Sequence, residues 1–435
     1  MLYDDGNSLI TLNSSESSSS LNALTDAFNT AAKFVHENNG ISPEDLKQKA
    51  PHELLNEINK SLSKAITDGL TSNGIKYEVP EIVTNALREN VWRFSGFKTY
   101  HQLKEAAQML VAETGEVKSF AQFRQDIEKI NNTYNGRYLE AEYEFAVHSA
   151  QMAARWNDFE QDGDDYNLQY RTAGDDKVRE DHAALNGATL PLADPFWNSY
   201  MPPLDWGCRC TVVQVRKEKY PESNSAEAQE LGKTATTRIA PDGSNKLAMF
   251  RFNPGKDLKI FPDKHPYFPR GCDRCEKNFN LAYDIPKNEL CQTCAIVKAM
   301  RVKQQNKIEK EKYRNEMLPL LSERIKKTVD VGEITVKFNA SGNKHLYSDT
   351  LGRAKGILLK DDLKNLDNAI NNAEFIKSAT LGKERKDKIT KFYYFKDRDK
   401  ELYYNVAEVE FKRKSGKIKY SRFLYSATRN LKSDE

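Results

Sequence analysis

The chain has 435 residues, of which 39% are hydrophobic and 30% charged, and this length predicts two or three domains rather than one core. No run of eighteen apolar residues occurs and the start lacks a signal-peptide pattern, so we expect synthesis in the cytoplasm and no membrane partner. Residues 301–435 contain 32 Lys and Arg against 20 Asp and Glu, whereas residues 1–300 contain 34 against 43. The basic C-terminal part suits RNA or DNA as a partner, and a solvated lysine-rich surface is the alternative.

The N-terminal part is predicted to be helical after a disordered start. Residues 1–20 include a serine-rich segment that cannot bury apolar area, so we expect disorder there. Residues 21–90 show apolar side chains at helical spacing. Ser42 followed by Pro43 is typical of a helix cap with proline at the first helical position.

A longer helical pattern carries aromatic side chains from Phe120 to Trp156. Spacings of three, four and seven residues place these side chains on one stripe, and Gly136 is the expected position of a kink. Such a stripe is typical of a hydrophobic core or a subunit interface rather than of a cofactor site.

Periodicity fades between residues 161 and 220, where Pro, Gly and Asp are frequent. This region contains His182 followed by Cys208 and Cys210. The three side chains supply three metal ligands without an obvious fourth, so a metal site and a loop packed through buried thiols both remain open. Residues 221–260 are predicted to be a polar linker.

The remaining four cysteines have the spacing of a zinc site. Two Cys-x-x-Cys pairs separated by fifteen residues can present four thiolates tetrahedrally to Zn²⁺, and a cytoplasmic origin disfavours disulfides. Four thiolates leave no open position, so the expected zinc is structural. The predicted ligands, in a zinc-ribbon-like segment over residues 261–300, are Cys272, Cys275, Cys291 and Cys294.

The C-terminal part is predicted to be a charged helical connector over residues 301–330 and an α+β domain over residues 331–435. A strand at residues 333–338 precedes a helix at residues 361–373. Three further strands, at residues 391–396, 402–412 and 417–426, follow with a hairpin turn between the last two. The fold class expected for the whole chain is therefore α+β multidomain, with a mainly helical N-terminal part.

Two sequence motifs in the central region resemble a known family. The run Arg179-Glu-Asp-His182-Ala-Ala-Leu-Asn-Gly, followed by Trp206-Gly-Cys-Arg-Cys210, is similar to the signature of the phage Mu F-like minor head proteins. The resemblance extends over roughly Val91 to Val215, within a domain placed at residues 91–220. It implies a virion-head protein that binds portal and capsid subunits, without catalytic residues in this domain.

The C-terminal domain resembles the nuclease-like domains of the barnase, colicin and RelE type, as found at the ends of polymorphic toxins. That resemblance implies metal-independent RNA cleavage and an immunity protein as a further partner. Such cleavage needs a base, an acid and cations around the phosphate. The candidate residues with these chemistries are His345, Lys344, Arg353, Tyr394, Arg422 and Tyr425.

Three hypotheses for function follow from the sequence. In the first, the protein is a structural component of the phage head, and its basic C-terminal domain binds nucleic acid without catalysis. In the second, the same domain is a ribonuclease effector carried with the virion, with His345 as base or acid. In the third, the cysteine-rich segment is a nucleic-acid-binding zinc ribbon.

Overall fold

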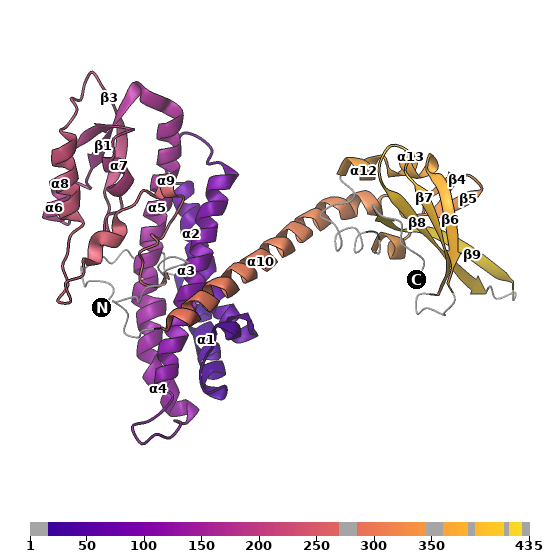
Figure 1. Cartoon of the computed structure of the whole chain (residues 1–435), viewed down its shortest axis with the longest axis horizontal. Helices are drawn as coiled ribbons and strands as arrows, with labels where there is room; N and C mark the ends of the chain where they lie inside the picture. Colours follow the sequence, from indigo (N-terminus) through magenta and orange to yellow (C-terminus); the bar gives the residue numbers. More distant parts are fainter. Residues whose placement is uncertain are drawn as a thin grey trace. The chain divides into compact units, whose positions relative to one another are not determined.

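The computed structural model describes residues 16–268, 285–344, 346, 360–381, 388–412 and 417–428. The chain divides into two compact units, Met1–Val302 and Lys303–Glu435, which are described separately (Figure 1). The first is mainly helical and carries a three-stranded sheet, and the second is built on a six-stranded sheet. This arrangement confirms the predicted α+β multidomain class.

Apolar periodicity explains the first helices of unit 1. Phe28 and Val35 are fully buried on the inner face of the first helix. The predicted cap forms: the backbone N–H and the hydroxyl of Ser42 donate to the Asp45 carboxylate over 2.8 and 2.7 Å, ahead of a short 3-10 helix. The first helix begins at Glu16, inside the segment expected to be disordered. These elements are α1 (Glu16–Glu37), η1 (Pro43–Lys47), α2 (Lys49–Leu70) and α3 (Glu81–Gln108).

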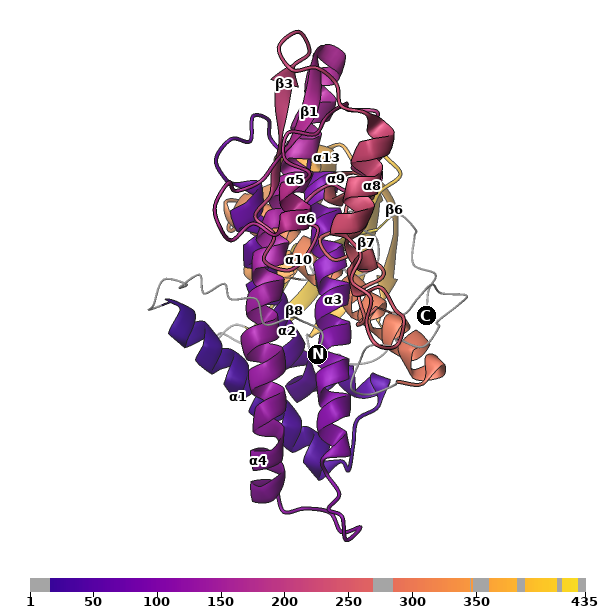
Figure 2. The ribbon, with the colours of Figure 1, turned by 90° about the vertical axis from the view of Figure 1, so that its left-hand side faces the viewer.

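The predicted aromatic stripe forms one continuous helical stretch in the centre of unit 1. Its side chains are core residues, as expected, because Phe123, Phe145 and Trp156 are at most 2% exposed. Gly136, where a kink was predicted, lies in a turn of π-helix, and Figures 1 and 2 show α4 continuing into α5 through this turn. The segments are α4 (Phe120–Asn131), η2 (Asn132–Tyr138) and α5 (Leu139–Asp162).

Helix α3 is enclosed on all sides over its second half. Every residue from Asn90 to Leu103 is buried except the half-buried Arg93. Gly96 allows a neighbouring helix to approach closely, because a Cβ at this position would lie 2.5 Å from Cγ2 of Val297. A helix buried on every face has no polar side, and so gives no amphipathic pattern in the sequence.

A charged pair lies at the centre of this helical core. The Lys98 ammonium donates to Glu142 over 2.7 Å, and both side chains are fully buried. The rings of Tyr134 and Tyr267 lie 5.6 and 5.7 Å from the same ammonium. Burial lowers the pKa of Lys98 despite the attraction of Glu142. Each charge therefore depends on the other for compensation.

The loop-rich region forms a small antiparallel sheet with its own core. The strand order is β2-β1-β3, and β1 pairs with both neighbours. Trp197 and Met201 are fully buried in this core, which packs beside α5 (Figure 1). The elements are β1 (Tyr166–Arg171), α6 (Glu180–Ala183), β2 (Thr189–Pro191), α7 (Phe196–Ser199) and β3 (Thr211–Arg216).

The segment predicted as a linker, residues 221–260, is structured instead. It contains α8 (Ser225–Ala235), η4 (Lys246–Phe250) and α9 (Pro254–Asp257). The buried face of α8 consists of small residues, among them Gly232, where a Cβ would lie 2.5 Å from Cγ of Tyr200. Because small residues carry little hydrophobicity, this packed helix has the composition of a polar linker.

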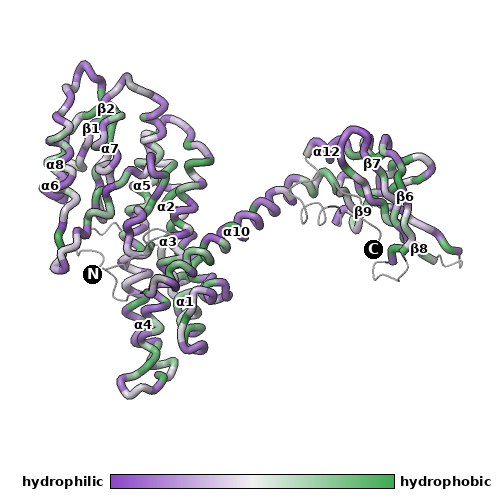
Figure 3. Tube along the Cα trace, in the orientation of Figure 1, coloured by the Kyte–Doolittle hydropathy of each residue, from purple (hydrophilic) through white to green (hydrophobic). Residues whose placement is uncertain are grey.

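Helix α10 (Lys287–Ser322) contains the boundary between the two units. Its first part belongs to unit 1: the Trp92 indole N–H donates to the carbonyl of Val297 over 2.9 Å, and the Tyr100 hydroxyl donates to Glu289 over 2.7 Å. No residue between Met300 and Met317 is buried, and Figure 3 shows this stretch as mainly hydrophilic. The predicted charged connector is thus the middle of one long helix.

Unit 2 contains the strands predicted from the sequence and two others. The sheet order is β4-β5-β9-β8-β7-β6, antiparallel throughout except for the β5–β9 pair. Strands β4 and β6 were not predicted. The hairpin turn expected at Ser415-Gly416 lies outside the described residues. The strands are β4 (Thr328–Val331), β5 (Ile334–Lys337), β6 (Glu374–Thr380), β7 (Ile389–Lys396), β8 (Tyr403–Lys412) and β9 (Ile418–Thr428).

The helix predicted before the last three strands is divided in two. These helices are α12 (Lys360–Lys364) and α13 (Leu366–Asn371). The three side chains expected on one face, Leu363, Leu366 and Ile370, are buried in the core between helices and sheet. Among the described residues, no helix has the length and apolar character needed to cross a lipid bilayer.

Candidate functional site

The candidate site is the cluster of His182, Cys208 and Cys210 in the loop-rich part of unit 1. His182 lies on the short helix α6, and the two cysteines immediately precede β3. All three side chains are buried, with exposed fractions of 2, 3 and 5%. Two segments separated by some 26 residues in the chain thus bring sulfur and nitrogen together in one core.

The three side chains face one another directly. Nδ1 of His182 lies 3.6 Å from the sulfur of Cys208 and 3.7 Å from that of Cys210. Of the His, Cys, Asp and Glu residues that the structure describes, these three form a group whose ligand atoms all lie within 4.8 Å of one another. The arrangement therefore offers one nitrogen and two sulfurs to a single point.

Burial alternates along the segment before β3. Cys208 and Cys210 are buried, whereas Arg209 between them is half-buried and points to the other side. On that outer side, the Arg209 guanidinium donates two hydrogen bonds to the Asp175 carboxylate, over 2.6 and 2.7 Å. This pairing holds the pKa of Asp175 below its ordinary value.

Tyr170 on β1 forms the wall of the cluster. Its side chain is fully buried, and its hydroxyl faces the two sulfurs without a hydrogen bond of normal geometry in the described part of the chain. Burial, and then the neighbouring cysteines, raise the pKa of Tyr170 well above its ordinary value. The phenol therefore stays protonated, and its hydroxyl can donate to the sulfurs that it faces.

The three side chains of the cluster shift one another's pKa values. A hydrogen bond from Cys210 lowers the pKa of Cys208, with His182 adding to the effect against the opposing influence of burial. The same contact raises the pKa of Cys210. Burial would lower the pKa of His182, but the Cys208 sulfur outweighs it and the net direction is upward.

A second layer of charges surrounds the cluster. The Asp205 carboxylate lies 3.5 Å from Arg179 and 3.2 Å from Arg238, and it also accepts a hydrogen bond from the backbone N–H of Trp206. Arg179 in turn donates to the carbonyl of Trp206 over 2.9 Å. These bonds fix the loop that leads into the Cys-x-Cys segment.

Only half of the second predicted metal site lies in the described part of the chain. Cys291 and Cys294 are on the first turns of α10, three residues apart and therefore on the same side of the helix. Cys294 is 7% exposed, within the core of unit 1, and Cys291 is half-buried. Cys272 and Cys275 lie outside the described residues, so the four-cysteine zinc site stays a prediction.

The candidate catalytic residues of unit 2 are not brought together by the described structure. His345 and Arg353 lie outside the described residues, and Lys344 is exposed at the end of a helical turn. Tyr394 and Tyr425 belong to an aromatic cluster on one face of the sheet. Arg422, on the next position along β9 from Phe423 of that cluster, points to the opposite face.

On that opposite face Arg422 joins a polar group that sequence analysis missed. Its Nε donates to Glu408 over 2.7 Å, and the Tyr393 hydroxyl donates to the same carboxylate over 2.9 Å. The ammonium of Lys391 lies 4.9 Å from the Tyr393 ring. Glu408 gave no signal in the sequence because its neighbours across the strands depend on the pairing of β7, β8 and β9.

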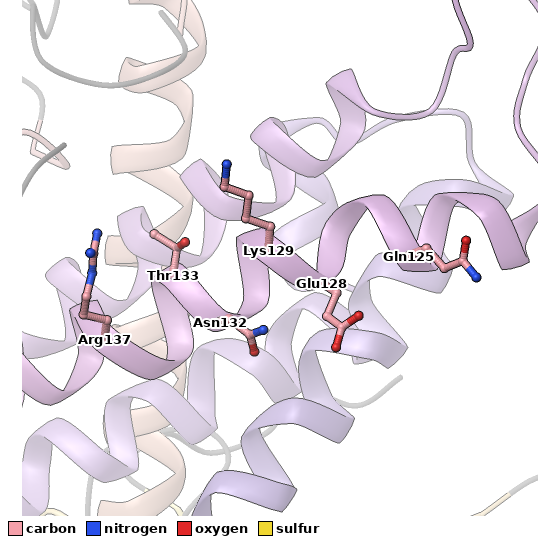
Figure 4. Close-up of a pocket in the computed structure, with 6 residues that line it drawn as sticks. All are labelled: Gln125, Glu128, Lys129, Asn132, Thr133 and Arg137. Carbon is pink, nitrogen blue, oxygen red and sulfur yellow. The ribbon is translucent and has the colours of Figure 1, made fainter.

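An open hollow on the helical part of unit 1 provides no comparable constellation. It encloses about 500 Å³, and Figure 4 shows its lining spread along one helical stretch from α4 into η2. The lining side chains are all polar: Gln125, Glu128, Lys129, Asn132, Thr133 and Arg137.

Comparison with known proteins places the His–Cys–Cys cluster within a recognised family region. Residues 56–213 match the family model described as Phage Mu protein F like protein, so all three side chains lie inside the match. The Mu-like prophage FluMu F protein of Haemophilus influenzae is 43% identical over 44 residues, which cover 10% of this chain and 11% of that protein. No solved structure matches the chain. The matched part of unit 1 is therefore similar to Mu F-like phage proteins, as the sequence motifs indicated.

Proposed function

We propose that the protein is a minor head protein of a phage or prophage, which binds portal and capsid subunits through unit 1 and is carried in the virion head. The observation that supports this proposal is the family match over residues 56–213, which spans α3, α5 and the His–Cys–Cys cluster. A well-packed helical core with an elaborated loop region is suited to a structural role in assembly.

Incorporation into heads tests the proposal. The full chain and a chain ending at Val302 are each produced with all other head proteins of the parent phage, and assembled heads are separated by density sedimentation. We expect both chains in the head fraction, because unit 1 has its own hydrophobic cores. Heads that assemble normally but contain neither chain would contradict the proposal.

We further propose that unit 2 is a nuclease-like effector. The observation that favours it is the group of Glu408, Arg422 and Tyr393 on one sheet face, which combines an acid or base, a fixed cation and a phenol. These are functions that RNA cleavage requires, and Lys391 adds positive charge beside them.

Expression of residues 303–435 from a repressed promoter tests the effector hypothesis. Growth and total RNA are followed for the unaltered sequence, for Glu408→Gln and for His345→Ala. Arrest with RNA fragmentation that either substitution relieves supports an effector, for which an immunity protein would be the natural partner. Normal growth and intact RNA with a folded fragment would leave a domain that binds nucleic acid without cleaving it.

The four-cysteine segment completes the proposed organisation as a structural zinc site. Two of its thiolates would come from the first turns of α10, where Cys291 and Cys294 lie on the same side of the helix. Zinc there would fasten the beginning of α10 to the preceding segment. Loss of zinc together with loss of fold in Cys291→Ser, without any change in nucleic-acid affinity, would separate this role from that of a nucleic-acid-binding zinc ribbon.

A further inference from the structure

We propose that His182, Cys208 and Cys210 bind a zinc ion of their own, which fastens the loop-rich region between β1 and β3. The distances between the ligand atoms carry the proposal. In a tetrahedral site with Zn–S of about 2.3 Å and Zn–N of about 2.0–2.1 Å, nitrogen and sulfur ligands lie about 3.6 Å apart. The two distances in the cluster are 3.6 and 3.7 Å.

Hydrogen bonding alone explains this geometry less well. Nδ1 of a neutral imidazole either carries one proton or accepts one, so it can make one good bond to one sulfur. Two sulfurs at nearly equal distances from the same nitrogen are instead the pattern of ligands that share an ion.

The ligand types select zinc and satisfy the charge balance of a buried site. Two thiolates and a neutral imidazole suit zinc, whereas Mg²⁺ and Ca²⁺ prefer oxygen ligands. On binding, the two thiols release their protons to solvent and no electron is transferred. The complex of Zn²⁺ with two thiolates is neutral, so it can be buried at 5% exposure or less without an uncompensated charge.

The surroundings supply the second layer that metal sites need. The buried Tyr170 hydroxyl faces both sulfurs, and a zinc-bound thiolate would be a strong acceptor for its hydrogen bond. Arg209 does not belong to this layer, because its guanidinium pairs with Asp175 on the outer side. Three protein ligands leave one position of the tetrahedron for water or for another ligand.

The position of the cluster defines what the ion does. It connects α6 to the segment before β3, and both lie against β1 through Tyr170. The elements of this region are short, with β2 covering three residues and α6 four. Because such short elements have few backbone hydrogen bonds of their own, an ion that connects them adds stability to that of the hydrophobic core around them.

Zinc content per chain tests the proposal on the full-length protein. Cys208→Ser, Cys210→Ser and His182→Gln are compared with Arg209→Gln, which changes the residue between the two cysteines and keeps the ligands. By elemental analysis we expect each ligand variant to hold one zinc fewer per chain than the parent, and the Arg209 variant to hold as much. A ligand variant with native circular dichroism that retains all its zinc would overturn the proposal.

X-ray absorption at the zinc edge of the unaltered protein avoids any dependence on how the variants fold. The proposal predicts a nitrogen shell at about 2.0–2.1 Å beside sulfur at about 2.3 Å. Sulfur ligands alone would assign all the zinc to the cysteines at 272–294 and reject the site. A protein free of zinc after growth in zinc-supplemented medium would also reject it.

Discussion

Two buried polar groups of unit 1 differ in whether their members satisfy one another's charges and hydrogen bonds. The Lys98–Glu142 pair is complete in the chain itself, because each fully buried charge has its opposite 2.7 Å away. The cluster of His182, Cys208 and Cys210 has its ligand atoms gathered but leaves the hydroxyl of Tyr170 and Nε2 of His182 without hydrogen bonds in the described structure. The helical core thus contains two charges that neutralise each other, whereas the loop-rich region brings together one nitrogen and two sulfurs that could bind a metal ion.

Tryptophan fluorescence can measure both groups without interference from unit 2. All four tryptophans, Trp92, Trp156, Trp197 and Trp206, belong to unit 1. Denaturant unfolding followed by their emission therefore reports the free energy of unfolding of this unit alone, in a protein whose two units need not unfold together.

The largest effect is expected from breaking the charge pair. Lys98→Met leaves the Glu142 carboxylate buried without its partner, and we expect it to lower the free energy of unfolding by about 3–5 kcal/mol. The double variant Lys98→Met/Glu142→Leu should recover much of this loss, because it leaves no buried charge. Equal losses in the single and double variants would show that packing, not charge, governs this position.

The second effect concerns acid stability of the same core. Burial lowers the pKa of His101 to about 4, against about 6.5 in an unfolded chain. The unfolded chain therefore takes up the proton first, so stability from the neutral ring is complete above pH 6.5 and is lost as the pH falls towards 4. We expect about 3 kcal/mol of acid destabilisation that His101→Gln removes. The same pH dependence in both proteins would contradict the buried neutral ring.

A smaller effect is expected at the wall of the cluster. Tyr170→Phe removes the hydroxyl that faces the sulfurs and keeps the ring. If zinc binds there, loss of this outer hydrogen bond should weaken its affinity about 10- to 100-fold, measured by competition with a chromogenic chelator. Unchanged affinity would show that the hydroxyl does not support the ligands.

The smallest effect is expected on the outer side of the Cys-x-Cys segment. Arg209→Ala removes the exposed ion pair with Asp175, and we expect a loss below about 1 kcal/mol in the free energy of unfolding. Zinc content should not change. A loss of zinc in this variant would mean that the pair, and not the alternation of the backbone, orients the two cysteines.

How much of the fold can be predicted depends on how each element is buried. The aromatic stripe from Phe120 to Trp156 has one buried face, so its period predicted both the helices and their place in the core. Helix α8 was not predicted, because its buried face is made of small residues such as Ala228 and Gly232. Strand β6 was not predicted, because it lies at the edge of the sheet and most of its side chains are exposed to solvent; Phe375, for example, is 51% exposed.

The residues of the candidate sites also divide into those that the sequence identified and those that only the structure revealed. His182, Cys208 and Cys210 were identified from residue type and spacing, because few other side chains bind metal in this way. Tyr170 and Glu408 were not, because their roles arise from tertiary neighbours that sequence spacing does not encode. The structure also separates Arg422 from Tyr394, since strand alternation sends their side chains to different faces.

The long helix α10 has a consequence for how such chains can change. The apolar core of unit 1 ends at Met300 and that of unit 2 begins at Met317, and no residue between them is buried. A genetic crossover within this stretch would leave both cores whole and require only that a helix continue into a helix. Recombination between related genes could therefore exchange everything from residue 303 onwards while preserving the first unit unchanged.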